Sequence, residues 1–174
     1  MKQTLLTISL ILFALTSISN SKSYEEEIFY PKGQGPFPVV ILSHRKGGPA
    51  PPYYKKAASM SGNGFVAIVL DHYSARGKYG NKFKNFPEVR EGMRWRQEDI
   101  VDVLNNLKNK PKIDRKKVIL AGWSAGAGIV LPIISNPNKI NVPSNISIAG
   151  AILTYPYTYG CYFEIESNLY SNFF

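Results

Sequence analysis

The fold is decided by the stretch Lys117-Val118-Ile119-Leu120-Ala121-Gly122-Trp123-Ser124-Ala125-Gly126. Its first half is an apolar run rich in β-branched side chains, which predicts a buried strand. Its second half carries the pattern G-x-S-x-G and opens an apolar segment typical of a helix. A serine at such a strand-to-helix turn holds its hydroxyl above the sheet, where it can act as a nucleophile. Ser124 is the first candidate catalytic residue, and a plain turn without chemistry is the alternative.

Strands and helices alternate on both sides of this turn. Apolar or alternating runs predict further strands at residues 24–30, 38–43, 65–70 and 148–155. Periodic apolar positions and end signals predict helices at residues 53–61, 88–109 and 124–134. This order indicates an α/β fold with a doubly wound, mostly parallel sheet and helices on both faces. Because ligands bind such sheets at the carboxyl ends of the strands, His44, His72 and Ser124 are expected at one rim.

The N-terminus has the composition of a signal peptide. Lys2 precedes an apolar stretch at residues 5–15, and small polar residues follow to Ser23. The apolar stretch is shorter than the roughly 18 residues that a membrane span needs, which favours cleavage over anchoring. We therefore expect a signal peptide at residues 1–21, a domain at residues 24–174, and export to a periplasmic or extracellular location without a stable span.

The composition of the chain limits which partners, disulfides and cofactors we expect. The formal net charge is +9, but the cations are scattered and no nucleic-acid motif accompanies them, so a solvated basic surface is expected. Cys161 is the only cysteine, so no intramolecular disulfide can form. Glu98 and Asp99 lie in a charged helical stretch without a histidine or further carboxylate at ligand spacing. We expect that stretch to be a solvated face, and we expect neither a metal nor a cofactor.

Ordered segments along most of the chain resemble the α/β-hydrolase superfamily, and within it the dienelactone hydrolase-like family. Besides the serine turn they are residues 37–44 with Gly47-Gly48, 64–71, Arg76-Gly77, 113–118 and 151–156. The resemblance implies a serine hydrolase that acts on small-molecule esters or lactones through Ser124. It also implies an oxyanion hole formed by the backbone N–H groups of Ala125 and Arg45.

Two positions depart from the family pattern. The family usually has glycine after the histidine of the first loop, where this chain has Arg45, and a positive φ there would strain arginine by about 1 kcal/mol. The family's catalytic order is nucleophile, acid, histidine, yet no histidine follows Ser124 and the only later acids are Glu164 and Glu166. His44 or His72 could replace the missing base, although both fit the role of loop-supporting residues.

These departures leave open whether the chain is an enzyme. Besides the two hypotheses that follow, a third interpretation is an incomplete gene product that folds poorly. The first is an exported serine hydrolase whose sequence matches the N-terminal portion of the family domain, lacks its C-terminal strands and helices, and is weak or inactive as written. The second is a non-catalytic exported binding protein on the hydrolase scaffold. Its exposed last strand would then pair with a second copy or with a complementing chain.

Overall fold

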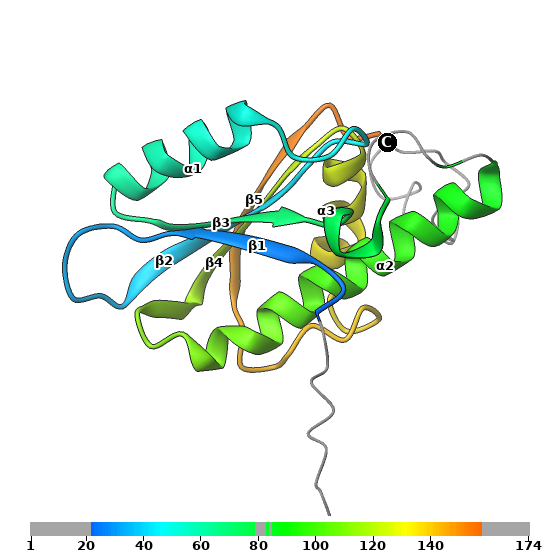
Figure 1. Cartoon of the computed structure of the whole chain (residues 1–174). Coiled ribbons are helices and arrows are strands. Elements are labelled where there is room, and N and C mark those ends of the chain that lie inside the picture. Colours follow the sequence, from blue (N-terminus) through cyan, green and yellow to red (C-terminus); the bar gives the residue numbers. More distant parts are fainter. Residues whose placement is uncertain (1–21, 79–82, 84, 158–174) are drawn as a thin grey trace, which may run out of the picture.

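A computed structural model describes residues 22–78, 83 and 85–157, which form a sheet covered by helices (Figure 1). The sheet has five strands in the order β1-β3-β2-β4-β5. The strands are β1 (Glu25–Phe29), β2 (Phe37–Ser43), β3 (Val66–Asp71), β4 (Ile113–Trp123) and β5 (Ile148–Thr154). Strand β1 runs antiparallel to β3, and the other pairs are parallel. The mostly parallel α/β sheet predicted from the sequence is confirmed.

The helices lie close to their predicted positions. They are α1 (Pro51–Gly62), α2 (Phe86–Asn106) and α3 (Ala125–Ser135), with 3-10 turns η1 (Ser74–Arg76) and η2 (Leu107–Asn109). Helix α1 starts two residues earlier than predicted, because proline is favoured in a first helical turn. Helix α2 starts at its cap, where Asn85 Oδ1 accepts the N–H of Glu88 at 3.0 Å. Strand β4 begins before its predicted start at Lys117.

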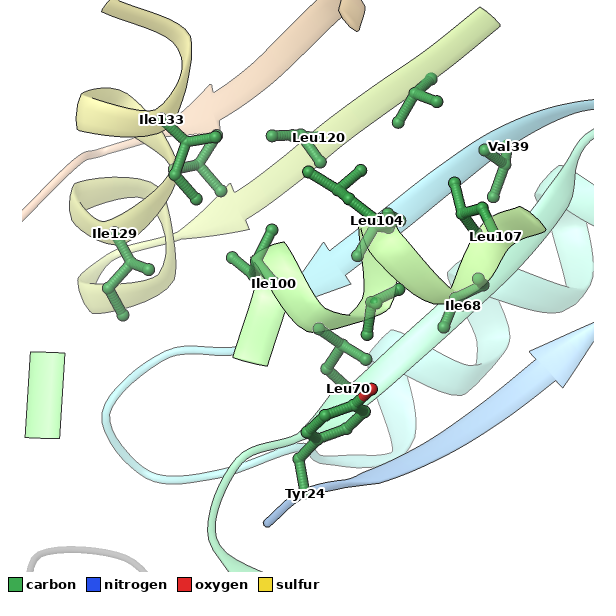
Figure 2. Packing of buried hydrophobic residues seen from close by; sticks show 14 of the residues in the cluster. Tyr24, Val39, Ile68, Leu70, Ile100, Leu104, Leu107, Leu120, Ile129 and Ile133 are labelled. Carbon is green, nitrogen blue, oxygen red and sulfur yellow. The ribbon is translucent and has the colours of Figure 1, made fainter. Parts of the chain in front are cut away.

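Two apolar clusters hold the layers together. On one face α1 covers side chains from the three central strands, with Val40, Leu42 and Val69 among the buried ones. On the other face α2 and α3 cover Val39, Ile41 and Ile68, and Figure 2 shows the helix residues that pack there, including Ile100, Leu104, Ile129 and Ile133. Successive residues of β2 thus enter opposite clusters, which explains its continuous apolar run.

Strand β5 lies at the end of the sheet, hydrogen-bonded to β4 alone among the described strands. Ile152 stands in register with Ala121 of β4, yet 44% of its surface is exposed. Tyr155, just after the strand, is 67% exposed. The described part of the chain therefore presents apolar side chains along this edge.

Several expectations fall outside the described residues. They are the signal peptide at residues 1–21, Cys161 and the late acids Glu164 and Glu166. Within the described ranges, no helix combines the length and the apolar character needed to span a bilayer.

Candidate active site

Ser124 sits at the junction of β4 and α3 in a strained backbone conformation. Its φ is 52° and its ψ is −118°, a region that costs a non-glycine residue on the order of 1–3 kcal/mol. Three backbone hydrogen bonds hold it there. The Ser124 N–H donates to Thr154 O at 3.0 Å, and Ser124 O accepts from the N–H groups of Gly128 at 3.0 Å and Tyr157 at 3.1 Å. Such over-determined strain is typical of a nucleophile turn.

The two glycines of the motif are required by contact with backbone. A Cβ on Gly122 would lie 2.5 Å from the N atom of Ala127, and a Cβ on Gly126 would lie 2.2 Å from the carbonyl oxygen of Ser43. No side chain can occupy either position without displacing main chain. Gly126 thereby allows the loop after β2 to lie directly against the first turn of α3.

The first turn of α3 offers donors to a negative charge. Ala125 is the first residue of the helix, so its N–H precedes the intrahelical hydrogen-bond ladder. Strand β2 runs parallel to β4 with Ser43 opposite Gly122, which brings the following residues, Arg45 and Ser124, to the same rim. The role of the Ala125 and Arg45 N–H groups as an oxyanion hole stays a prediction.

Arg45 differs from its expectation in two respects. Its φ is not positive, so the predicted backbone strain is absent. Its N–H already donates to the phenolic oxygen of Tyr53 at 3.0 Å. The oxyanion role of Arg45 remains a prediction, and the phenol stands where an oxyanion would meet that N–H.

Both histidines of the sequence lie in a buried hydrogen-bond network beneath this rim. The His72 Nδ1–H donates to Asp99 Oδ2 at 2.8 Å, and His72 Nε2 lies 3.1 Å from Ser43 Oγ. The His44 Nδ1–H donates to Arg45 O at 2.6 Å, and His44 Nε2 accepts the His72 N–H at 3.3 Å. We assign these tautomers because carboxylates and carbonyls only accept. Every ring nitrogen has a partner other than Ser124.

The electrostatics of the network keep both imidazoles neutral. Burial lowers the pKa of His44 and of His72 well below the ordinary value of 6.5, and the nearby Arg96 cation lowers both further. A neutral imidazole can accept a proton, but these two are buried completely. They support the loops at the rim, which matches the alternative role considered from the sequence.

Asp99 anchors the network and corrects one expectation. Arg76 Nη1 and Nη2 donate to its two carboxylate oxygens at 2.8 and 2.7 Å, and Ser23 Oγ donates to Oδ1 at 3.0 Å. Burial raises the pKa of the Asp99 carboxyl, and Arg76 opposes that rise. The solvated face expected for this stretch of α2 is wrong at Asp99 and at Arg96, because both are buried against the loops after β2 and β3.

Arg96 holds the loop after β2 from below. Its Nη2 donates to the carbonyl oxygen of His44 and lies 3.4 Å from Ser43 Oγ, while Nη1 donates to Tyr73 Oη at 3.2 Å. In the part of the chain that the structure describes, its Nε has no partner and the guanidinium forms no ion pair. Burial lowers the pKa of Arg96, whereas the nearby Tyr73 and Asp99 oppose that shift. The hydrogen bonds of Arg96 tie the loop after β2 to α2.

Sequence reasoning missed Ser43, Tyr53 and Arg96. The spacing of Arg96 and Asp99, three residues apart on one helix, places both on one face and was an available signal. Among the described residues, the Ser124 hydroxyl has neither a histidine nor a carboxylate as partner. The same residues include no group of three or more side chains placed to hold a metal ion.

The chain is similar in sequence or in structure to several known proteins. The chain is 28% identical to the peroxisomal succinyl-coenzyme A thioesterase of Mus musculus over 124 residues, which are 71% of this chain and 26% of that protein. The structure of Est1E from Butyrivibrio proteoclasticus with bound ferulic acid matches at a TM-score of 0.57 and 16% identity, over 76% of this chain and 49% of that chain. The structure of an esterase of Pyrobaculum calidifontis matches at a TM-score of 0.54 and 19% identity, over 76% of this chain and 40% of that chain.

These matches agree on the fold, and they cover only part of each relative. The chain spans about a quarter of the mouse protein and half or less of the two esterases. The family profile described as "Dienelactone hydrolase family" matches residues 25–144, which include the strained serine turn and the loop beside it. The chain belongs to the dienelactone hydrolase family.

Proposed function

We propose that this chain is the nucleophile-bearing part of an exported serine hydrolase that cleaves carboxylic ester or lactone bonds. One observation carries the proposal: Ser124 adopts a strained backbone conformation between β4 and α3, next to a first helical N–H that precedes the intrahelical ladder. The mouse relative, named as a thioesterase, extends the bond class to thioesters. Export is supported by the N-terminal sequence pattern alone.

The chemistry follows from the turn. Ser124 Oγ attacks the carbonyl carbon and its proton passes to a solvent water, while the π electrons move to the carbonyl oxygen, which becomes the oxyanion of a tetrahedral intermediate. The Ala125 N–H and the positive end of the α3 dipole stabilise that charge. The carbonyl then re-forms and expels the alkoxide or thiolate, which takes up a proton from solvent, and water hydrolyses the resulting acyl-serine to the free acid and Ser124.

The proton of Ser124 limits the rate. Both histidines of the sequence are buried and their ring nitrogens already have partners, so we expect neither to take this proton. Loss of the serine's base costs about 10⁶-fold in kcat in a well-studied serine protease, with a remainder due to the oxyanion hole. We expect the 174-residue chain alone to turn over activated esters slowly.

Labelling of Ser124 tests this proposal. The purified chain is treated with a fluorophosphonate, and the modified peptide is identified by mass spectrometry, alongside hydrolysis of p-nitrophenyl acetate. We expect slow labelling confined to Ser124 and turnover above that of Ser124→Ala. A cooperatively melting chain that is not labelled, and that hydrolyses no faster than Ser124→Ala, would refute the proposal.

The second candidate is a binding protein without catalysis, and the exposed edge at β5 favours it. Ile152 on β5 and Tyr155 just after it expose large side chains, and β5 pairs on one side only among the described strands. Such an edge can pair with a second copy or with a complementing chain. Sedimentation velocity tests self-association: a dimer that Ile152→Lys dissociates supports it, and a monomer at every concentration excludes pairing between copies.

A further inference from the structure

Tyr53 lies between the loop after β2 and the serine turn. It belongs to the first turn of α1, which begins at Pro51, and its own N–H donates to Ala50 O at 2.9 Å. Its ring is buried and meets the ring of Trp123 edge-on, with the centroids 5.3 Å apart. Trp123 directly precedes Ser124 in the chain. The Tyr53 ring therefore packs against the residue that precedes the nucleophile, and its hydroxyl is held by the backbone of the loop after β2.

The Tyr53 hydroxyl has an unused proton. Its oxygen accepts the Arg45 N–H at 3.0 Å, and no acceptor for its own hydrogen is present among the described residues. Burial raises the pKa of Tyr53, so the phenol stays protonated at neutral pH. An N–H that donates to a hydroxyl also polarises its O–H bond and makes it a better donor.

The Arg45 N–H cannot serve an oxyanion while Tyr53 holds it. Freeing that N–H would require the phenol to move, although α1 and the Trp123 ring confine it. We propose that the Tyr53 hydroxyl is itself the second oxyanion donor, held in place by the Arg45 N–H and acting together with the Ala125 N–H. This inference rests on the proposed function of Ser124.

A boronic acid tests the donor without needing a catalytic base. The Ser124 oxygen adds to the trigonal boron of n-butylboronic acid and its proton leaves to solvent, which gives a tetrahedral anion with an oxygen in the oxyanion position. Boron-11 NMR reports the change from trigonal to tetrahedral boron and yields Kd. The variants are Tyr53→Phe, Ser124→Ala, and the control Tyr54→Phe, which changes a half-buried neighbour on the same helix.

We expect Tyr53→Phe to weaken binding about 10- to 100-fold, since removal of one oxyanion donor has effects of this order or larger. Tyr54→Phe should leave Kd unchanged, and p-nitrophenyl acetate turnover should lose kcat but keep KM in Tyr53→Phe. Unchanged or tighter boronate binding in Tyr53→Phe overturns the inference. Tighter binding would show that the phenol blocks the Arg45 N–H instead of donating to the oxyanion. Wild-type binding that does not depend on Ser124 refutes the proposed function, and the inference falls with it.

A measurement on the unmutated protein covers the case in which Tyr53→Phe does not fold. With tyrosine labelled by carbon-13 at Cζ, boronate binding should shift the Tyr53 resonance and leave that of Tyr54 in place. A Tyr53 resonance that does not move while boron becomes tetrahedral overturns the inference.

Discussion

Two serines lie at the carboxyl ends of neighbouring strands, and they differ in every respect that matters for catalysis. Ser43 ends β2 and lies 3.1 Å from a histidine that itself donates to Asp99 at 2.8 Å, which is the hydrogen-bond order of a catalytic triad. It is completely buried, and its backbone is extended. Ser124 ends β4 in a strained turn, is partly exposed, and has neither a histidine nor an acid as partner among the described residues.

The comparison teaches that hydrogen-bond order alone does not make a nucleophile. A carbonyl carbon must reach the hydroxyl, and donors must await the charge that develops. Ser43 satisfies neither condition, because it is completely buried. Its hydrogen bond with His72, which in turn donates to Asp99, stabilises the rim instead. The partly exposed Ser124 turn, followed by the first N–H of α3, fits both conditions of the proposed mechanism, and no described histidine or carboxylate pairs with its hydroxyl.

The largest expected effect separates the two serines by labelling. Fluorophosphonate should modify Ser124 in wild type and in Ser43→Ala, and modification should disappear in Ser124→Ala, a loss of at least about 10³-fold in labelling rate. Mass spectrometry of the tryptic peptides measures it. Phosphonate on Ser43 in a natively folded sample would show that the buried chain is the reactive one.

The next effect concerns the contact that joins the two regions. In Gly126→Ala the new Cβ would lie 2.2 Å from Ser43 O and 2.6 Å from His44 O, so main chain must move. We expect the free energy of unfolding to fall by about 3 kcal/mol, measured by urea denaturation. Gly150→Ala is the control: a Cβ on Gly150 meets nothing within 4 Å, so a change within about 0.5 kcal/mol is expected. Equal effects at both glycines would show that the contact is not tight.

The smallest effect is a pH dependence of the free energy of unfolding, which arises from the two histidines in the buried network around Ser43. In the unfolded chain each imidazole takes up a proton near pH 6.5, whereas burial holds the folded pKa of His44 and His72 well below that value. Below about pH 6.5 the unfolded state binds more protons, so stability falls with falling pH, by about 1.4 kcal/mol per unit for each histidine.

Urea melts between pH 7 and 5.5 measure this slope. Because burial raises the folded pKa of Asp99 above its ordinary value of 3.8, proton uptake by folded Asp99 opposes the slope toward the acidic end of this range. His72→Gln should reduce the slope by about half. A wild-type slope near zero would mean that the histidines are protonated in the folded protein.

The sequence predicted what depends on local pattern. The position of Ser124 between a strand and a helix was predicted correctly, because strand, turn and helix follow one another within a few residues. The buried network was not predicted, because in sequence Arg96 and Asp99 resemble the residues of a solvated charged helix. Their hydrogen-bond partners come from other segments of the chain. Arg76 and Ser43 are far from them in sequence, and only the assembled sheet brings them together. Strand β4 was predicted too short, because residues 114–117 are charged although they continue the strand.

The chain carries two tryptophans, and the fold assigns one to each region. The ring of Trp123 touches Tyr53 beside the nucleophile, and the ring of Trp95 lies under the guanidinium of Arg76, 4.0 Å from its carbon, beside the buried network. Each tryptophan therefore reports by its fluorescence on one of the two regions. Trp95→Phe would leave a single emitter next to Ser124, and Trp123→Phe a single emitter next to Asp99, so ligand binding and acid-induced loosening can be followed optically and separately without an added dye.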